Sequence, residues 1–194
     1  MKKLMSGNEA IARGAFEWGV RFAAGYPGTP STEIMEAIST YPDIYSEWST
    51  NEKVALEVAM GAAYGGVRAL ASMKHVGLNV AADSLFAAST TGIIGGFVVV
   101  SCDDPGEHSS QGEQDNRHLA KFAKVPMLEP TDSQEAYDLM DWAFKISEEF
   151  DTPVLLRTTT RVAHVKGIIT IGEPECSSAK LGIEKMPEKF VMLP

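Results

Sequence analysis

The sequence predicts an α/β fold in which helices cover both faces of a parallel β-sheet. Along most of the 194 residues, short apolar segments of strand length alternate with longer helical segments, the pattern of βαβ units. The clearest strand, residues 96–101, contains Phe-Val-Val-Val without alternation, as in a strand buried on both faces. Four turns or loops each follow a strand, which in such a sheet places them at one edge.

The first half of the chain contains the clearest helix signals. Ser6-Gly-Asn-Glu9 is a capping box for a helix to about Trp18. Asn51 caps a second helix, in which Glu52 takes the first turn and Gly65-Gly66 the end. The other predicted elements are a strand at 20–24, a turn at 25–30, a helix from Ser31 or Thr32 to about 39, and a strand at 44–48.

The second half continues the alternation and then loses it. Predicted in order are a strand at 68–73, a turn at 74–77, an Ala-rich helix to about 91, the strand at 96–101, a polar loop at 102–117, a helix at 118–123, a strand at 126–128, a helix from a capping box at 132–135 to 150, and a strand at 153–158. Periodicity weakens beyond Val165. We therefore expect one α/β domain at 1–165, and a C-terminal extension or the start of a linker at 166–194.

Ligands of open parallel sheets bind outside the carboxyl ends of the strands. The segments 25–30, 51–52, 74–77 and 102–117 all follow predicted strands. The sequence therefore predicts one functional edge that carries all four of them.

Composition excludes several classes of protein. The formal net charge is −9, and no basic cluster offsets it, which argues against nucleic-acid binding. No apolar run approaches the ~20 residues of a membrane span, and the N-terminus becomes polar too soon for a signal peptide. Cys102 and Cys176 are too few for a disulfide framework or a zinc site and favour a reducing cytoplasm. No metal site is expected in this chain.

Taken alone, the candidate residues also have structural explanations. A carboxylate in a first turn, such as Glu52, is favoured by the helix dipole. His75 could be an ordinary hydrogen-bonded histidine, Cys102 a small apolar residue, and the charged loop a solvated surface. The chain contains no dinucleotide-binding glycine motif, no Walker motif, no nucleophile elbow and no C-x-x-C pair.

Combined motifs carry more information than any single residue. Tyr26-Pro-Gly-Thr-Pro30, together with Asn51-Glu-x-x-Ala-x-x-x-Ala-x-Gly61, resembles the pyrimidine-binding domain of thiamine diphosphate enzymes in the 2-oxoacid:ferredoxin oxidoreductase family. Residues 47–59, 73–79 and 103–117 are similar to alpha subunits of the branch that acts on indolepyruvate. The resemblance covers nearly the whole chain.

The resemblance implies roles for particular residues. Glu52 matches the glutamate that accepts a hydrogen bond at N1′ of the cofactor's aminopyrimidine ring and promotes removal of the proton from C2 of the thiazolium. The small residues of its helix are expected to leave room for that ring. Thr29 matches a threonine near the substrate carboxylate. Tyr26, Pro27 and His75 are expected on the cofactor side, and His75 is also expected on the substrate side with Gln111, Asn116 and Arg117.

The implied activity is oxidative decarboxylation of indolepyruvate or other arylpyruvates to acyl-CoA, with reduction of ferredoxin. The chain lacks the G-D-G…N segment that binds Mg²⁺ and diphosphate and the cysteines that hold 4Fe-4S clusters. The resemblance therefore implies that other alpha-subunit domains and a beta subunit complete the enzyme, in a larger oligomer, and that this chain is inactive alone. Two alternatives stay open: another thiamine-dependent 2-oxoacid decarboxylase subunit, and a non-catalytic assembly domain.

Overall fold

The computed structural model describes residues 1–174 and 185–191. Cys176 and the other residues of 175–184 and 192–194 lie outside this description. The elements in chain order are β1 (Lys2–Ser6), α1 (Gly7–Glu17), β2 (Phe22–Gly25), α2 (Thr32–Ile38), β3 (Tyr45–Trp48), α3 (Glu52–Tyr64), β4 (Ala69–Lys74), α4 (His75–Val80), α5 (Ala82–Thr91), β5 (Phe97–Asp103), α6 (Asn116–Ala123), β6 (Met127–Leu128), α7 (Ser133–Phe150), β7 (Val154–Thr159), α8 (Thr160–His164), β8 (Lys166–Thr170) and α9 (Pro187–Phe190).

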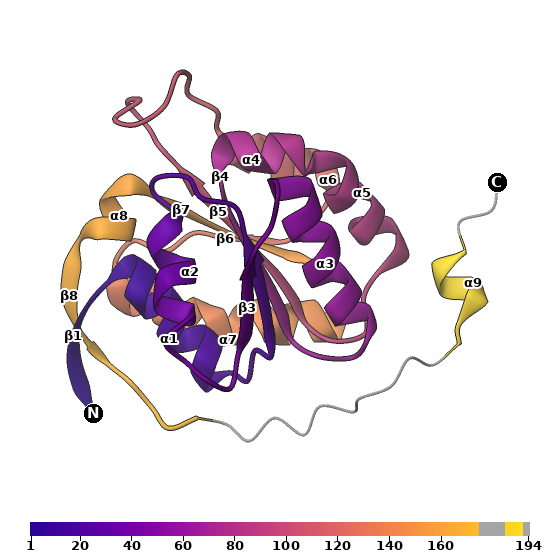
Figure 1. Ribbon diagram of the computed structural model, residues 1–194, viewed down its shortest axis with the longest axis horizontal. Helices are drawn as coiled ribbons and strands as arrows, with labels where there is room; N and C mark the ends of the chain where they lie inside the picture. The colour runs from indigo at the N-terminus through magenta and orange to yellow at the C-terminus, as the bar shows by residue number, and fades with distance from the viewer. Residues whose placement is uncertain (175–184, 192–194) are drawn as a thin grey trace.

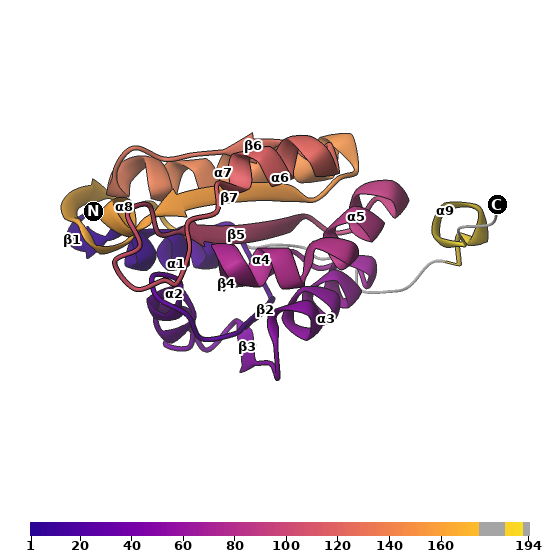
Figure 2. The same ribbon diagram turned by 90° about the horizontal axis from the view of Figure 1, so that it is seen from above.

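A six-stranded sheet in the order β3-β2-β4-β5-β7-β6 forms the centre of the fold. All of its neighbouring strands run parallel. Figure 2 shows this order as the strands succeed one another from one side of the molecule to the other. The predicted parallel α/β fold is confirmed.

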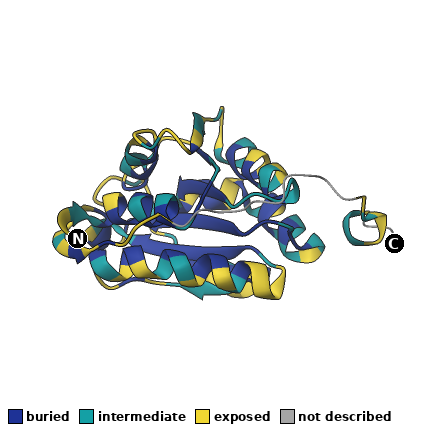
Figure 3. Ribbon diagram, turned by 90° about the horizontal axis from the view of Figure 1, so that it is seen from below, coloured by how far each residue is buried: buried dark blue, intermediate teal, exposed yellow. Residues whose placement is uncertain are grey.

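Helices cover both faces of the sheet, and each face has its own apolar core. On one face α1, α2 and α7 pack over Leu70, Val98 and Val100. On the other face α3, α4, α5 and α6 pack over Ala69, Ala71 and Val99. Successive residues of the inner strands therefore enter opposite cores. β5 is buried throughout and β4 and β7 nearly so, whereas the edge strand β3 exposes Tyr45 and Trp48, and the helices expose their outer faces (Figure 3).

Two strands lie outside the central sheet and were not predicted. β1 pairs antiparallel with β8, so that Leu4 faces Ile168. The two strands run side by side in Figure 1, with the N-terminus at their end. The predicted boundary at residue 165 stays a prediction, and the segment that follows it begins with β8, whose Ile169 is fully buried in the core.

Several predicted boundaries were wrong by a few residues. The predicted strand at 20–24 is shifted to β2, and the predicted turn at 74–77 is the first turn of α4, which starts directly after β4. Cys102 and Asp103 belong to β5, while Asn116 and Arg117 begin α6, so the loop is restricted to 104–115. This loop projects beyond the rest of the fold at the top of Figure 1.

Helix starts were predicted more accurately. The Ser6–Glu9 capping box is present. Asp132 accepts a hydrogen bond from the Glu135 backbone, but the Glu135 carboxylate accepts from Thr131 instead of closing the predicted second box. In the part of the chain that the structure describes, no helix is long and apolar enough to cross a bilayer.

Candidate functional site

Glu52 is the first residue of α3, directly beyond the carboxyl end of β3. The Asn51 side chain accepts a hydrogen bond of 3.0 Å from the Val54 backbone and fixes the helix start. Glu52 is partly exposed, and no described residue forms a hydrogen bond or ion pair with its carboxylate. A rigidly positioned carboxylate thus remains available to a ligand.

Gly77 in α4 provides the surface against which the Glu52 side chain lies. A Cβ atom at Gly77 would be 2.4 Å from Cγ of Glu52 and 2.7 Å from its Oε1. Any side chain at this position would therefore displace the carboxylate. The first turn of α4 and the first turn of α3 form one unit around Glu52.

The small residues of α3 do not line a ligand space, contrary to expectation. Ala55, Ala59 and Ala63 are fully buried in the core against the sheet. Their size lets α3 approach β2 and β4 closely. Gly61 is exposed, and a Cβ atom added to it would meet nothing within 4 Å.

The loop after β2 presents the predicted Tyr26, Pro27 and Thr29 to solvent at the same edge. Its interior is tied down: the Gly28 N–H donates to Thr32, and Asn8 donates 2.7 Å to the Pro30 carbonyl. A Cβ at Gly28 would be 3.2 Å from Cβ of Lys74. This contact joins the loop to the end of β4.

His75, the first residue of α4, is completely buried. Its Nε2 lies 3.0 Å from the carbonyl oxygen of Gly112, and Nδ1 has no partner among the described residues. Because a carbonyl can only accept, Nε2 carries the proton in this contact. The structure places His75 under the 104–115 loop, which it holds against α4.

Asn116 is also buried and bonded within the protein. Its amide donates 2.6 Å to the Ser101 hydroxyl and 3.3 Å to the His75 carbonyl. Its backbone N–H donates to Asp103, which also accepts 2.8 Å from Arg157. Burial raises the pKa of Asp103, while the hydrogen bonds from Arg157 and Asn116 oppose this rise.

Arg157 ties several elements together beneath the loop. It pairs with Asp103 at the end of β5 and with Glu129 after β6, and lies 3.8 Å from Asp115, the N-cap of α6. Its side chain is only 5% exposed. A buried arginine with carboxylate partners on three segments fixes both ends of the loop region.

Asp104 fastens the loop itself. It accepts hydrogen bonds from the Ser109 backbone, the Ser110 hydroxyl and the Thr160 hydroxyl, at 2.8, 2.6 and 2.7 Å. Burial pushes the pKa of Asp104 upward, but these bonds and the nearby charge of Lys74 outweigh it and lower the pKa to about 2. These hydrogen bonds fasten the loop to its own residues 109 and 110 and to Thr160 at the start of α8.

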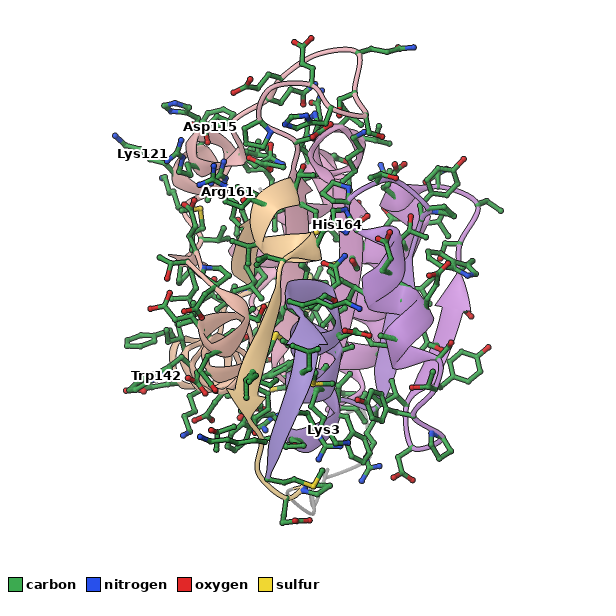
Figure 4. The ribbon with its side chains drawn as sticks, turned by 90° about the vertical axis from the view of Figure 1, so that its left-hand side faces the viewer. Lys3, Asp115, Lys121, Trp142, Arg161 and His164 are labelled. Atoms are coloured by element: carbon green, nitrogen blue, oxygen red, sulfur yellow. The ribbon has the colours of Figure 1, made fainter. Side chains whose placement is uncertain are left out.

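The two remaining predicted residues lie on the surface. Gln111 is exposed and lines a cavity with Lys74. Arg117 is exposed and pairs with Asp115 at 2.8 Å. Figure 4 shows Asp115 at the same end of the molecule as Arg161 of α8. The structure thus joins Glu52, His75 and Asn116 through α4, with Arg117 further out on α6.

Sequence reasoning placed the segments of Lys74, Gly77 and Asp104 at this edge but gave these three residues no individual role, and it missed Arg157. One signal was available: Arg157 interrupts the apolar strand Val-Leu-Leu, and a charged residue in a buried strand requires a partner. The contacts of the other three depend on how loops approach α4, which no local pattern reveals.

Comparison with known proteins agrees with this fold and identifies the family of the chain. Residues 13–191 match the family model described as pyruvate flavodoxin/ferredoxin oxidoreductase, thiamine diphosphate-binding. The chain belongs to this family, and its core is the family's thiamine diphosphate-binding domain. The predicted membership of the 2-oxoacid:ferredoxin oxidoreductases is confirmed.

Curated relatives identify the branch. The chain is 53% identical over 191 residues to indolepyruvate oxidoreductase subunit IorA of Methanothermobacter marburgensis, covering 97% of this chain and 31% of that protein. It is 50% identical over 201 residues to the same subunit of Archaeoglobus fulgidus, covering 100% of this chain and 32% of that protein. The predicted similarity to the indolepyruvate branch is confirmed, and the chain spans about a third of the length of these relatives.

A solved structure shows the same fold. The 2-oxoglutarate:ferredoxin oxidoreductase from Magnetococcus marinus, determined with 2-oxoglutarate, coenzyme A and succinyl-CoA bound, superimposes with a TM-score of 0.79 at 20% identity. The match covers 92% of this chain and 34% of that one.

Proposed function

We propose that this chain forms the pyrimidine-binding half of the active site of a thiamine diphosphate-dependent 2-oxoacid:ferredoxin oxidoreductase, and that Glu52 is its catalytic carboxylate. One observation carries the proposal. Glu52 stands at the carboxyl edge of the sheet, seated on Gly77, and no described residue bonds to its carboxylate.

The residues present fit the pyrimidine end of the cofactor. Glu52 would accept a hydrogen bond from a ring nitrogen, and the exposed Tyr26 and Pro27 lie at the same edge of the sheet. His75, buried at the start of α4, holds the 104–115 loop through the Gly112 carbonyl. When bound, thiamine diphosphate supplies the nucleophilic carbon that attacks the keto group and retains the electrons when carbon dioxide leaves.

The proposed substrate is indolepyruvate or another arylpyruvate, with Thr29, Gln111, Asn116 and Arg117 on the substrate side of the edge. Asn116 acts there through Ser101 and His75, because its amide is buried. The overall reaction converts the 2-oxoacid anion, coenzyme A and two oxidised ferredoxins to acyl-CoA, carbon dioxide, a proton and two reduced ferredoxins. Atoms and charge balance in this form.

Other parts of the enzyme supply what this chain lacks. We assign the Mg²⁺ and diphosphate site and the 4Fe-4S clusters to further domains of the alpha subunit and to a beta subunit, in an oligomer. A cytoplasmic location, which the cysteine usage favours, stays a prediction.

The test compares Glu52→Gln with wild type in the full-length enzyme with its partner subunit. We expect turnover with indolepyruvate to fall by about 10²- to 10⁴-fold, the usual contribution of acid–base catalysis, with an unchanged unfolding transition. Glu36→Gln, at an exposed position of α2, is the control and should retain activity. Full activity of Glu52→Gln would refute the proposed role.

The same assay separates the alternatives. A ferredoxin oxidoreductase requires an electron acceptor and coenzyme A, whereas a simple decarboxylase releases an aldehyde without either. An assembly domain would tolerate Glu52→Gln.

A further inference from the structure

A cavity of about 530 Å³ opens beside the Glu52 site. Lys74 and Val76, at the junction of β4 and α4, line one side of it. The other side is the loop, through residues 109–112 and Gln114. Val76 precedes Gly77, so the same helical turn that supports Glu52 forms the wall of this cavity.

Lys74 gives the cavity a positive charge. The other lining residues are neutral, and no carboxylate lies among them. Within residues 1–174 and 185–191, no carboxylate oxygen lies within 4.0 Å of Nζ of Lys74. One N–H donates 2.7 Å to the Ser109 carbonyl, which leaves two donors for a ligand.

The neighbouring Asp104 carboxylate forms no hydrogen bond or ion pair with this cation. Its two carboxylate oxygens already accept three hydrogen bonds, from Ser109, Ser110 and Thr160. Lys74 acts on it only through space. In a chain with a net charge of −9, a cavity whose only charged lining residue is a lysine is suited to an anion with polar groups around it.

We propose that Lys74 is a specificity-determining residue that binds the carboxylate group of the 2-oxoacid substrate in this cavity. This inference rests on the proposed function, which makes the substrate a 2-oxoacid. The substrate carboxylate would enter near the Glu52 carboxyl group, and Lys74 supplies the positive charge that favours an anion there. The Ser109 hydroxyl and the glutamine amides of the loop supply further donors to the anion, whereas the Ser110 hydroxyl already donates to Asp104.

The test uses three variants in the full-length enzyme. Lys74→Arg keeps the charge, Lys74→Gln keeps a donor for the Ser109 carbonyl without the charge, and Lys74→Met keeps neither. We expect KM for indolepyruvate to rise about 10- to 100-fold in the Gln and Met variants, the loss typical of a charge-assisted hydrogen bond, and only a few-fold in the Arg variant. Lys3→Met is the control, because Lys3 lies on β1 at the opposite end of the molecule (Figure 4).

A binding measurement adds a readout that does not depend on turnover. Calorimetric titration with indole-3-propionate and with its neutral amide should show a preference for the acid in wild type and in Lys74→Arg. The preference should disappear in Lys74→Gln and Lys74→Met. A purely structural role of Lys74 would weaken both probes equally.

Three results would overturn the inference. One is an unchanged KM for indolepyruvate in Lys74→Met. Another is a KM for indolepyruvate that stays near the wild-type value in Lys74→Gln but rises strongly in Lys74→Arg. That result would indicate that the lysine only fastens the loop. A third is a rise in KM for coenzyme A alone, which would assign the anion to its phosphates. Failure of the proposed function is distinguishable, because it appears as an active Glu52→Gln enzyme in the same assay.

Discussion

Gly77 matters because it has no side chain. We predict that Gly77→Ala displaces the Glu52 carboxylate, which lies within 3 Å of the new Cβ. The displaced atoms belong to a flexible side chain, and alanine is the better helix former by about 1 kcal/mol, so the free energy of unfolding should stay equal or rise. Turnover of the full-length enzyme should nevertheless fall about 100-fold. Steady-state assays and urea titration measure the two effects.

Gly61→Ala is the matched control for this prediction. Gly61 lies in α3, the helix of Glu52, and has open space where a Cβ would be. It should gain the same helix stability, roughly 0.5–1 kcal/mol, and keep full activity. Equal activity of the two alanine variants would show that Gly77 does not position Glu52.

Single residues were predictable where a local pattern fixes their role. Ser6 and Asn51 cap their helices as predicted, because a cap depends on neighbours three residues away. Lys74 was not identified, because its partners Gly28 and Ser109 lie 46 and 35 residues away in the chain. Long-range contacts of this kind leave no periodic signal.

Arg157 stabilises the junction between β5, β7 and α6. We predict that Arg157→Met costs roughly 3–5 kcal/mol of unfolding free energy, because it leaves the buried Asp103 without its cation. Adding Asp103→Asn should recover part of this loss, since the uncompensated charge is removed. Chemical denaturation of the four proteins in a double-mutant cycle measures the coupling, and strictly additive costs would contradict the pairing.

The 104–115 loop should depend on pH through Asp104. The pKa of Asp104 is about 2 in the folded chain, below the value of about 3.9 in the unfolded chain. The ionised carboxylate therefore stabilises the fold fully at pH values above about 4. The contribution, roughly 2 kcal/mol, is lost as pH falls from about 4 towards 2. Asp104→Asn should therefore be less stable than wild type at pH 7, and the difference should shrink below pH 4 in denaturation experiments. A difference that does not change with pH would contradict this.

Whole elements were predictable when their burial leaves a clear pattern of apolar residues in the sequence. β5 was identified by its Val-rich run, which is buried throughout. β1 and β8 were missed because they form a surface ribbon whose Leu4 and Ile168 are 65% and 71% exposed. Their paired residues lie 160 to 168 positions apart in the chain, and only their pairing makes them strands.

At the scale of the molecule, the shared edge was predictable and its internal order was not. Parallel strands place their carboxyl ends together, so Gly25, Glu52 and Lys74 had to lie on one side. Which strands are neighbours depends on the packing of helices on both faces. The order β3-β2-β4-β5 puts the β2 loop and α3 next to α4, and this adjacency makes Gly77 and Lys74 part of the site.

That arrangement also predicts how the cofactor divides its contacts. This edge offers the pyrimidine a carboxylate, whereas the sequence contains no diphosphate motif. The 194-residue chain should therefore bind thiamine diphosphate with Mg²⁺ at least 100-fold more weakly than the full-length enzyme with its partner subunit. Calorimetric titration of both proteins measures this, with circular dichroism to verify that the shorter chain is folded. Equal affinities would place the whole cofactor site within this chain, and Glu52 would then need a phosphate-binding neighbour on the same edge.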